Sequence, residues 1–159
     1  MKEILMSVNK PHTDNIHSGK KTSELRTRPP KIPTPFKVYM YETIAGGGCG
    51  KVVSEWICKD MTEWLMYMGI PAHLSIKGCV SNEHILKYCN NGKKNITEME
   101  IDQASVKVYD RPKELRNFCK VKHLKTKAAI SNPDGEEGWQ IKRPPQNWCF
   151  VKERKDDER

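Results

Sequence analysis

The sequence contains no long hydrophobic run, and no stretch approaches the roughly 18 apolar residues that a membrane-spanning helix needs. It also lacks a secretory pattern near its start, because Met1-Lys2-Glu3 leads directly into a short apolar segment. We therefore expect a cytoplasmic protein that makes no membrane contact. None of the six cysteines form a Cys-x-x-Cys pair, and in a cytoplasmic protein we expect them to be reduced thiols.

Internal repeats are also absent. A chain of 159 residues with 36% hydrophobic content is long enough to bury one core. We expect a single domain over residues 1–151. Residues 152–159 mix charges of both signs, which is typical of a flexible tail. The oligomeric state is left open.

Positive charge is in excess and is unevenly spread. The chain has 28 Lys and Arg against 20 Asp and Glu, a formal net charge of +8, which favours polyanionic partners. Residues 1–35 hold seven basic side chains against three acidic ones, and residues 111–127 hold seven against one. Two basic patches on a small domain suggest a groove. The plainer explanation is that the charge only keeps the protein soluble.

The hydrophobic pattern predicts many short strands and few helices. Expected strands span residues 4–8, 21–27, 36–42, 51–58, 104–109 and 148–151. Expected helices span residues 11–16, 61–68, 81–88 and 112–118. This combination is typical of an α+β protein with a small, strongly bent mixed sheet or β-barrel and short flanking helices.

The glycine-rich segment 46–51 is similar to a phosphate-binding loop only superficially. Val52 stands where that motif needs Ser or Thr, and the segment joins two expected strands instead of opening a helix. We therefore expect a hairpin turn at this position.

Metal or thiol chemistry has little support in the sequence. Cys119 with His123 comes near the spacing of zinc ligands, whereas Cys79, His84 and Cys89 do not. No cysteine is marked as an activated nucleophile by its neighbours. We expect buried, unreactive thiols and neither a metal nor a cofactor.

Residues 18–26 are the most informative segment. Strand alternation would place Thr22, Glu24 and Arg26 on one face, and Ser23 and Leu25 on the other. A hydroxyl, a carboxylate and a guanidinium suit a polar cleft that binds phosphate and a polar ring better than they suit a core. The alternative is a solvated edge strand whose charges prevent aggregation.

Four aromatic residues could stack on a base: Tyr39, Tyr41, Trp139 and Trp148. Most aromatic side chains in proteins are buried in the core, which is the alternative for each of these four. Trp148 is our candidate for stacking, because it follows the polar run Arg143-Pro144-Pro145-Gln146-Asn147.

Taken together, these segments resemble ASCH domains. The resemblance lies in residues 4–11 (ILMSVNKP) and 16–26 (IHSGKKTSELR), with a Gly-x-Lys followed by Glu-x-Arg on the next strand. Residues 36–41 (FKVYMY), 108–115 (VYDRPKEL) and 143–149 (RPPQNWC) resemble a bacterial and phage subgroup of the same family. The resemblance implies a PUA-like β-barrel with flanking helices, a role in RNA binding or nucleic-acid modification, and a cleft lined by Lys21, Glu24 and Arg26.

Some members of that family are amidohydrolases that deacetylate acetylcytidine with a Lys, a Thr and a Glu, and others are ribonucleases. Lys21 matches the lysine, but Glu24 stands where the nucleophilic threonine would be. A carboxylate does not replace an activated hydroxyl in acyl transfer.

The leading hypothesis is an RNA- or nucleotide-binding module. Glu24 would recognise the base, Trp148 would stack, and the remaining residues of the cleft would be Lys20, Lys21, Thr22, Arg26 and Arg28, with the four cations contacting phosphate. One alternative is a hydrolase acting on a modified nucleoside or on RNA, with Lys21 and Glu24 as catalytic candidates. A second is a phage or host protein-interaction module that uses the basic residues 111–127.

Overall fold

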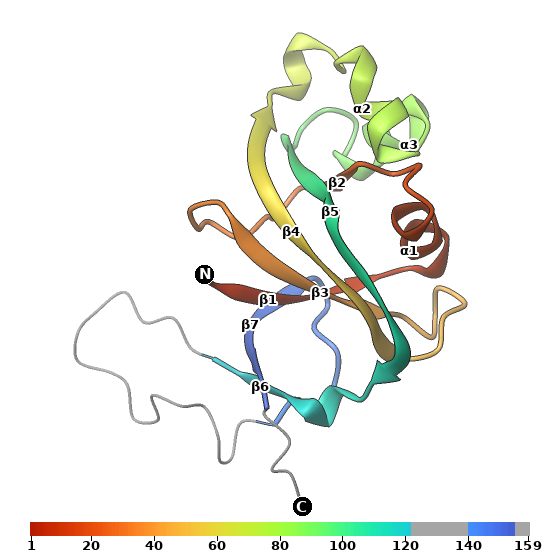
Figure 1. Cartoon of the computed structure of the whole chain (residues 1–159). Coiled ribbons are helices and arrows are strands. Elements are labelled where there is room, and N and C mark those ends of the chain that lie inside the picture. Colours follow the sequence, from red (N-terminus) through yellow and green to blue (C-terminus); the bar gives the residue numbers. More distant parts are fainter. Residues whose placement is uncertain (122–139, 155–159) are drawn as a thin grey trace, which may run out of the picture.

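The computed structural model describes residues 1–121 and 140–154. They form an α+β fold around a mixed seven-stranded sheet with the strand order β2-β5-β4-β3-β1-β7-β6 (Figure 1). The strands are β1 (Glu3–Val8), β2 (Ser23–Arg26), β3 (Phe36–Glu42), β4 (Lys51–Trp64), β5 (Ile96–Lys113), β6 (Phe118–Lys120) and β7 (Trp148–Glu153). The α-helices are α1 (Lys10–His17), α2 (Ala72–Gly78) and α3 (Asn82–Tyr88), and short 3₁₀ turns span Met66–Met68 and Leu115–Asn117.

Strand β1 lies inside the sheet, parallel to β3 and antiparallel to β7. Its residues alternate between two apolar layers: Ile4 and Met6 belong to one core cluster, and Leu5 belongs to a second cluster with Tyr39. A strand buried on both faces reads as a continuous apolar run, which is why residues 4–8 were recognisable in the sequence.

Two parallel strands need a crossover between them, and helix α1 followed by β2 begins that connection. Pro11 stands in the first turn of α1, where its missing N–H is tolerated. The helix ends at His17 with Ser18 as its C-cap, and Gly19 follows with a φ of +81°. The chain therefore turns directly from α1 into β2, as the sequence predicts.

The two longest strands, β4 and β5, form an antiparallel pair that bends strongly along its length (Figure 1). Register shifts interrupt this pairing at several points, and such irregularities increase local twist and bending. The sheet is strongly curved and not closed into a barrel, because no pairing among the described residues joins β2 to β6.

Helices α2 and α3 lie together beyond one end of the β4–β5 pair (Figure 1). Their apolar side chains meet β2 and β5 in a third core cluster that contains Leu25, Leu74, Ile85 and Ile96. This cluster holds both helices beside β2, where the candidate site lies.

Several sequence-based boundaries were wrong. Met61 continues β4 opposite Met99, so the helix expected over residues 61–68 is reduced to the 3₁₀ turn Met66–Met68. Residues 112 and 113 end β5, and the helix expected over residues 112–118 is reduced to a 3₁₀ turn. In both places strand pairing, which is not local in sequence, overrides the local pattern.

Helix α2 was not predicted at all. At the C-terminal end, Lys152 and Glu153 belong to β7 and pair with β6, so the expected tail does not begin at residue 152. No helix in the described part of the chain is long and apolar enough to cross a membrane.

Candidate nucleic-acid interface

A half-open cavity of about 360 Å³ lies where β1, α1, β2 and α3 meet. Its polar lining includes Ser7, Asn9, His12, Lys21, Glu24 and Arg26. Its apolar wall is formed by side chains of the third core cluster, namely Leu25, Val80, Ile85 and Ile96. The lining is therefore mixed, and a concave site where polar groups converge beside an apolar wall is a candidate ligand site.

Glu24 is the most unusual group in this cavity. It is only 6% exposed, and its Oε2 atom has no hydrogen-bond partner among the described residues. Its Oε1 atom lies 3.4 Å from Nε of Arg26. Burial raises the pKa of Glu24, but the charges of Lys21 and Arg26 outweigh this and hold the pKa below its ordinary value. The cavity therefore contains an ionised carboxylate with one unused acceptor oxygen.

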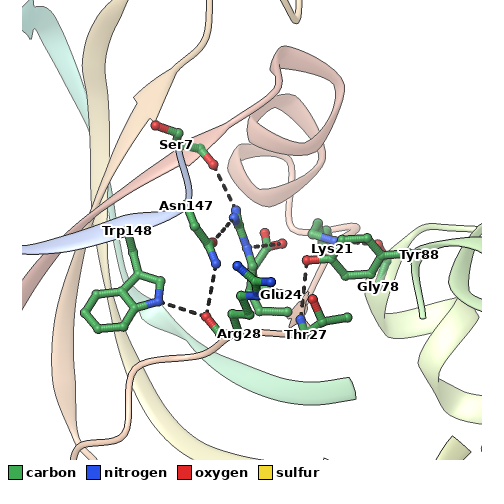
Figure 2. A network of polar contacts seen from close by, with 10 residues as sticks. Ser7, Lys21, Glu24, Thr27, Arg28, Gly78, Tyr88, Asn147 and Trp148 are labelled. Carbon is green, nitrogen blue, oxygen red and sulfur yellow. Dashed lines mark hydrogen bonds and ion pairs between the residues drawn. The ribbon is translucent and has the colours of Figure 1, made fainter. Parts of the chain in front are cut away.

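Arg26 is held rigidly beside that carboxylate. One of its terminal nitrogens donates to Oδ1 of Asn147 at 2.6 Å and the other donates to the Ser7 carbonyl at 2.9 Å (Figure 2). Asn147 in turn donates to the Arg28 carbonyl at 3.0 Å, and so does Nε1 of Trp148 at 2.8 Å. These contacts join the end of β2 to the start of β7.

Lys21 is buried, with 1% of its surface exposed, although it is a lysine. Its Nζ donates to the Gly78 carbonyl at the end of α2, at 2.6 Å. Figure 2 shows Glu24 between two groups, with Asn147 and Trp148 on one side and Lys21, Gly78 and Tyr88 on the other. Arg26 on β2 therefore forms an ion pair with the carboxylate, and Lys21, which precedes β2, adds a second positive charge nearby.

Sequence reasoning missed several residues of the cavity, above all His12. Its Nδ1 is buried and has no hydrogen-bond partner within residues 1–121 and 140–154, and burial together with the charge of Lys21 lowers its pKa. His12 stands four residues before Ile16, which is 1% exposed, so helical spacing could have placed it on the inner face of α1. His84 and Tyr88 on α3 also line the cavity, but they come from a distant segment and carry no local signal.

The structure brings Lys21, Glu24 and Arg26 together as predicted, but not the other candidates. Lys20 and Arg28 are exposed and do not line the cavity. Thr22 precedes β2 and is used in backbone pairing with Lys77 and Ile101. The strict alternation of faces was wrong, because Leu25 lines the cavity and Thr22 does not.

The aromatic candidates lie elsewhere. Trp148 packs edge-on against Phe150, with ring centroids 5.1 Å apart, and is not part of the cavity lining. Tyr39 and Tyr41 are buried in the second core cluster. Trp139 lies outside the described residues, and stacking by Trp148 stays a prediction.

The remaining sequence motifs have structural roles. Residues 46–50 form the turn between β3 and β4, where Gly47 and Gly50 adopt positive φ angles, so the expectation of a hairpin turn is confirmed. Within the described ranges, no group of three or more His, Cys, Asp or Glu could hold a metal ion, and His123 lies outside those ranges. The six cysteines are free thiols, but the expectation that they are buried holds only for Cys58, Cys89 and Cys119, since Cys49 is exposed and Cys79 and Cys149 are half-buried.

Comparison with known family models and with curated proteins finds no match for this chain. Solved structures of an ASCH protein from Zymomonas mobilis are similar in fold. The first has a TM-score of 0.66 and 17% sequence identity, and the match covers 95% of this chain and 88% of that one. Two single-residue mutants of that protein give TM-scores of 0.63 and 0.62, each with 18% identity. The chain therefore has the fold of an ASCH domain, which confirms the resemblance seen in the sequence.

Proposed function

We propose that this protein binds RNA, or a nucleotide, in the cavity formed by Lys21, Glu24 and Arg26. The observation that carries this proposal is the buried Oε2 of Glu24, an ionised acceptor with no partner in the part of the chain that the structure describes. Buried polar atoms are nearly always hydrogen-bonded, and an exception at the base of a cavity points to a ligand that supplies the missing donor.

The charge of the molecule supports a ligand that contains phosphate. The formal net charge is +8, and the cavity itself holds two fixed cations against one carboxylate. Arg28, Lys142 and Arg143 are exposed on the two segments that Asn147 and Trp148 join. Basic side chains on adjoining segments can follow a phosphate backbone that leads to the cavity. The ASCH fold, which the sequence resemblance links to RNA binding, supports the same hypothesis of a ligand that contains phosphate.

Hydrolysis of a modified nucleoside or of RNA is the second candidate. It is favoured by the presence of two groups in one cavity that can accept a proton, the Glu24 carboxylate and neutral His12. Turnover of an acylated nucleoside that is lost in Glu24→Gln would support this candidate over binding alone. The protein-interaction alternative draws on residues 111–127, of which 122–127 lie outside the described ranges.

The binding proposal can be tested with single-stranded RNA and exposed residues whose replacement leaves the core intact. We expect Lys20→Ala/Arg28→Ala to weaken RNA binding and to reduce the slope of log affinity against log salt by about one per lost phosphate contact. Fluorescence anisotropy at several salt concentrations measures both quantities.

The matched control is Lys59→Ala/Lys107→Ala, which removes the same charge from exposed positions on β4 and β5. Neither control residue adjoins a lining residue in the sequence, whereas Lys20 adjoins Lys21 and Arg28 follows Arg26 by two positions. Equal losses in both double variants would show that only net charge matters. Absence of RNA binding by the wild-type protein would overturn the proposed function.

A further inference from the structure

The cavity presents donors and acceptors in a fixed order. The hydrogen bond to the Gly78 carbonyl accounts for one of the three N–H donors of Lys21. The Oε2 atom of Glu24, in the same cavity, is an acceptor with no partner in the described part of the chain. Arg26 is fixed by Asn147 and Ser7 and cannot swing across to Oε2 without breaking both hydrogen bonds.

A ligand group complementary to this arrangement must bring N–H donors to the carboxylate and an acceptor oxygen to the ammonium. An ionised carboxylate can accept two parallel hydrogen bonds and offers no donor of its own. Among the common bases, only guanine carries two adjacent N–H donors, N1–H and the N2 amino group, with a keto oxygen beside them. In adenine and cytosine the amino group stands beside a ring nitrogen that is an acceptor, and in uracil the single N–H lies between two keto oxygens, so the carboxylate would face and repel an acceptor in each case.

The charges and the shape of the cavity restrict the possible ligands further. Lys21 and Arg26 together exceed the single negative charge of Glu24, so a cationic guanidinium or amidinium group with the same donor pair would be repelled. Leu25, Val80 and Ile85 give the cavity apolar walls, which suit the faces of a flat, neutral ring. Tyr88 lines the same cavity and is 41% exposed.

We propose that this cavity selects guanine, with the Glu24 carboxylate accepting from N1–H and the N2 amino group and with the Lys21 ammonium donating to O6. The inference rests on the proposed function and deepens it by naming the base. A guanine that enters a cavity of this kind must be unpaired, so the substrate class is single-stranded RNA or a free guanine nucleotide.

The first test uses the wild-type protein alone. Five-nucleotide RNAs that are uridine except for guanosine, inosine or adenosine at the centre are compared by fluorescence anisotropy. Inosine retains O6 and N1–H but lacks the N2 amino group. We expect the guanosine RNA to bind at least about fivefold more tightly than the inosine RNA, and the adenosine RNA to bind more weakly still.

The second test replaces the acceptor. Glu24→Gln keeps the shape of the side chain but gives it an amide with a single acceptor oxygen, so the preference for guanosine over adenosine should disappear while salt-dependent RNA binding persists. Glu63→Gln, an exposed position on β4, is the matched control and should keep the preference. A thermal melt establishes that each variant is folded.

The outcomes separate this inference from the proposed function. Equal affinity of the wild-type protein for the guanosine, inosine and adenosine RNAs would overturn the guanine assignment and leave RNA binding intact. A preference for guanosine that survives in folded Glu24→Gln would also overturn it. Failure to bind any of the RNAs would overturn the proposed function itself.

Discussion

At the scale of single residues, the candidate site is a small set of buried charges that hold one another in place. Lys21, Glu24 and Arg26 would each be costly to bury alone. Two of them are compensated by backbone carbonyls, Gly78 for Lys21 and Ser7 for Arg26. Glu24 is compensated mainly by their charges. Its Oε2 atom is buried and has no hydrogen-bond partner among the described residues, and it is the acceptor that our proposal assigns to a ligand donor.

Asn147 connects this set to the rest of the molecule, because its Oδ1 accepts from Arg26 and its amide donates to the Arg28 carbonyl. We predict that Asn147→Ala lowers the free energy of unfolding by about 1–3 kcal/mol, since it leaves donors of a buried guanidinium unpaired. Denaturation with urea measures the change. Asn95→Ala is the control: its exposed amide donates to Glu63, and its loss should change stability by no more than about 0.5 kcal/mol. Equal effects in the two variants would contradict this role of Asn147.

At the scale of elements, the position of α2 depends on its last residue. A Cβ atom at Gly78 would lie 2.7 Å from Cδ1 of Leu25, closer than real contacts allow. Gly78 therefore lets the end of α2 approach β2 until its carbonyl meets the Lys21 ammonium.

We predict that Gly78→Ala destabilises the fold by about 1–3 kcal/mol through overpacking against buried Leu25. It should also weaken RNA binding, because the carbonyl that positions Lys21 must move. Urea denaturation and anisotropy measure the two effects. Ser75→Ala should change neither, because the Ser75 hydroxyl makes a long hydrogen bond of 3.5 Å to the Ala72 carbonyl within the same helix. A folded Gly78→Ala protein with unchanged stability would contradict the tight approach of α2 to β2.

Elements with a strong local signal could be predicted from the sequence, and elements defined by distant contacts could not. Strand β3 was predicted to the residue, since residues 36–42 alternate clearly. The ends of β4 and β5 extend beyond their apolar patterns because they pair with each other over polar residues such as Asp60 and Glu100. Helix α2 is short and has no side-chain cap, so nothing in residues 72–78 marks it.

The same distinction applies to the site. Glu24 and Arg26 stand two residues apart on β2, so strand alternation predicts that they share a face, whereas Lys21 precedes β2 and was placed in the cleft by the family resemblance. Asn147 and Gly78 are separated from them by more than fifty residues, and only the folded sheet brings them there. Lys20 and Arg28 were grouped with the site by adjacency, whereas their side chains are exposed.

At the scale of the whole molecule, three carboxylates in different places share one electrostatic property. Burial raises the pKa of Glu24, Glu55 and Glu98, but in each case nearby partners reverse the effect and leave the pKa below its ordinary value of 4.5. The Glu98 carboxylate forms hydrogen bonds with His73, Ser23 and Trp64 at 2.8, 2.7 and 3.2 Å. The partners of Glu55 are Lys37 and Tyr109.

These carboxylates make stability depend on pH in a direction that can be worked out. A carboxyl whose pKa is lower in the folded than in the unfolded state binds fewer protons when folded, so it stabilises the fold above pH 4.5 and loses that effect as pH falls. His12 and His17 act in the same direction from a higher pH, since burial lowers their pKa below 6.5 and the unfolded chain takes up their protons first.

We therefore predict that the melting temperature begins to fall as pH drops below about 6.5 and falls more steeply below 4.5. Thermal melts between pH 3 and pH 7 at constant ionic strength measure the profile. In Glu98→Gln the melting temperature should fall less steeply below pH 4.5. The variant lacks already at neutral pH the stabilisation that the wild-type protein loses only in acid. The decrease in melting temperature caused by Glu98→Gln should therefore be larger at pH 7 than at pH 3. An equal decrease at both pH values would show that the ionised carboxylate does not stabilise the contact between α2 and β5.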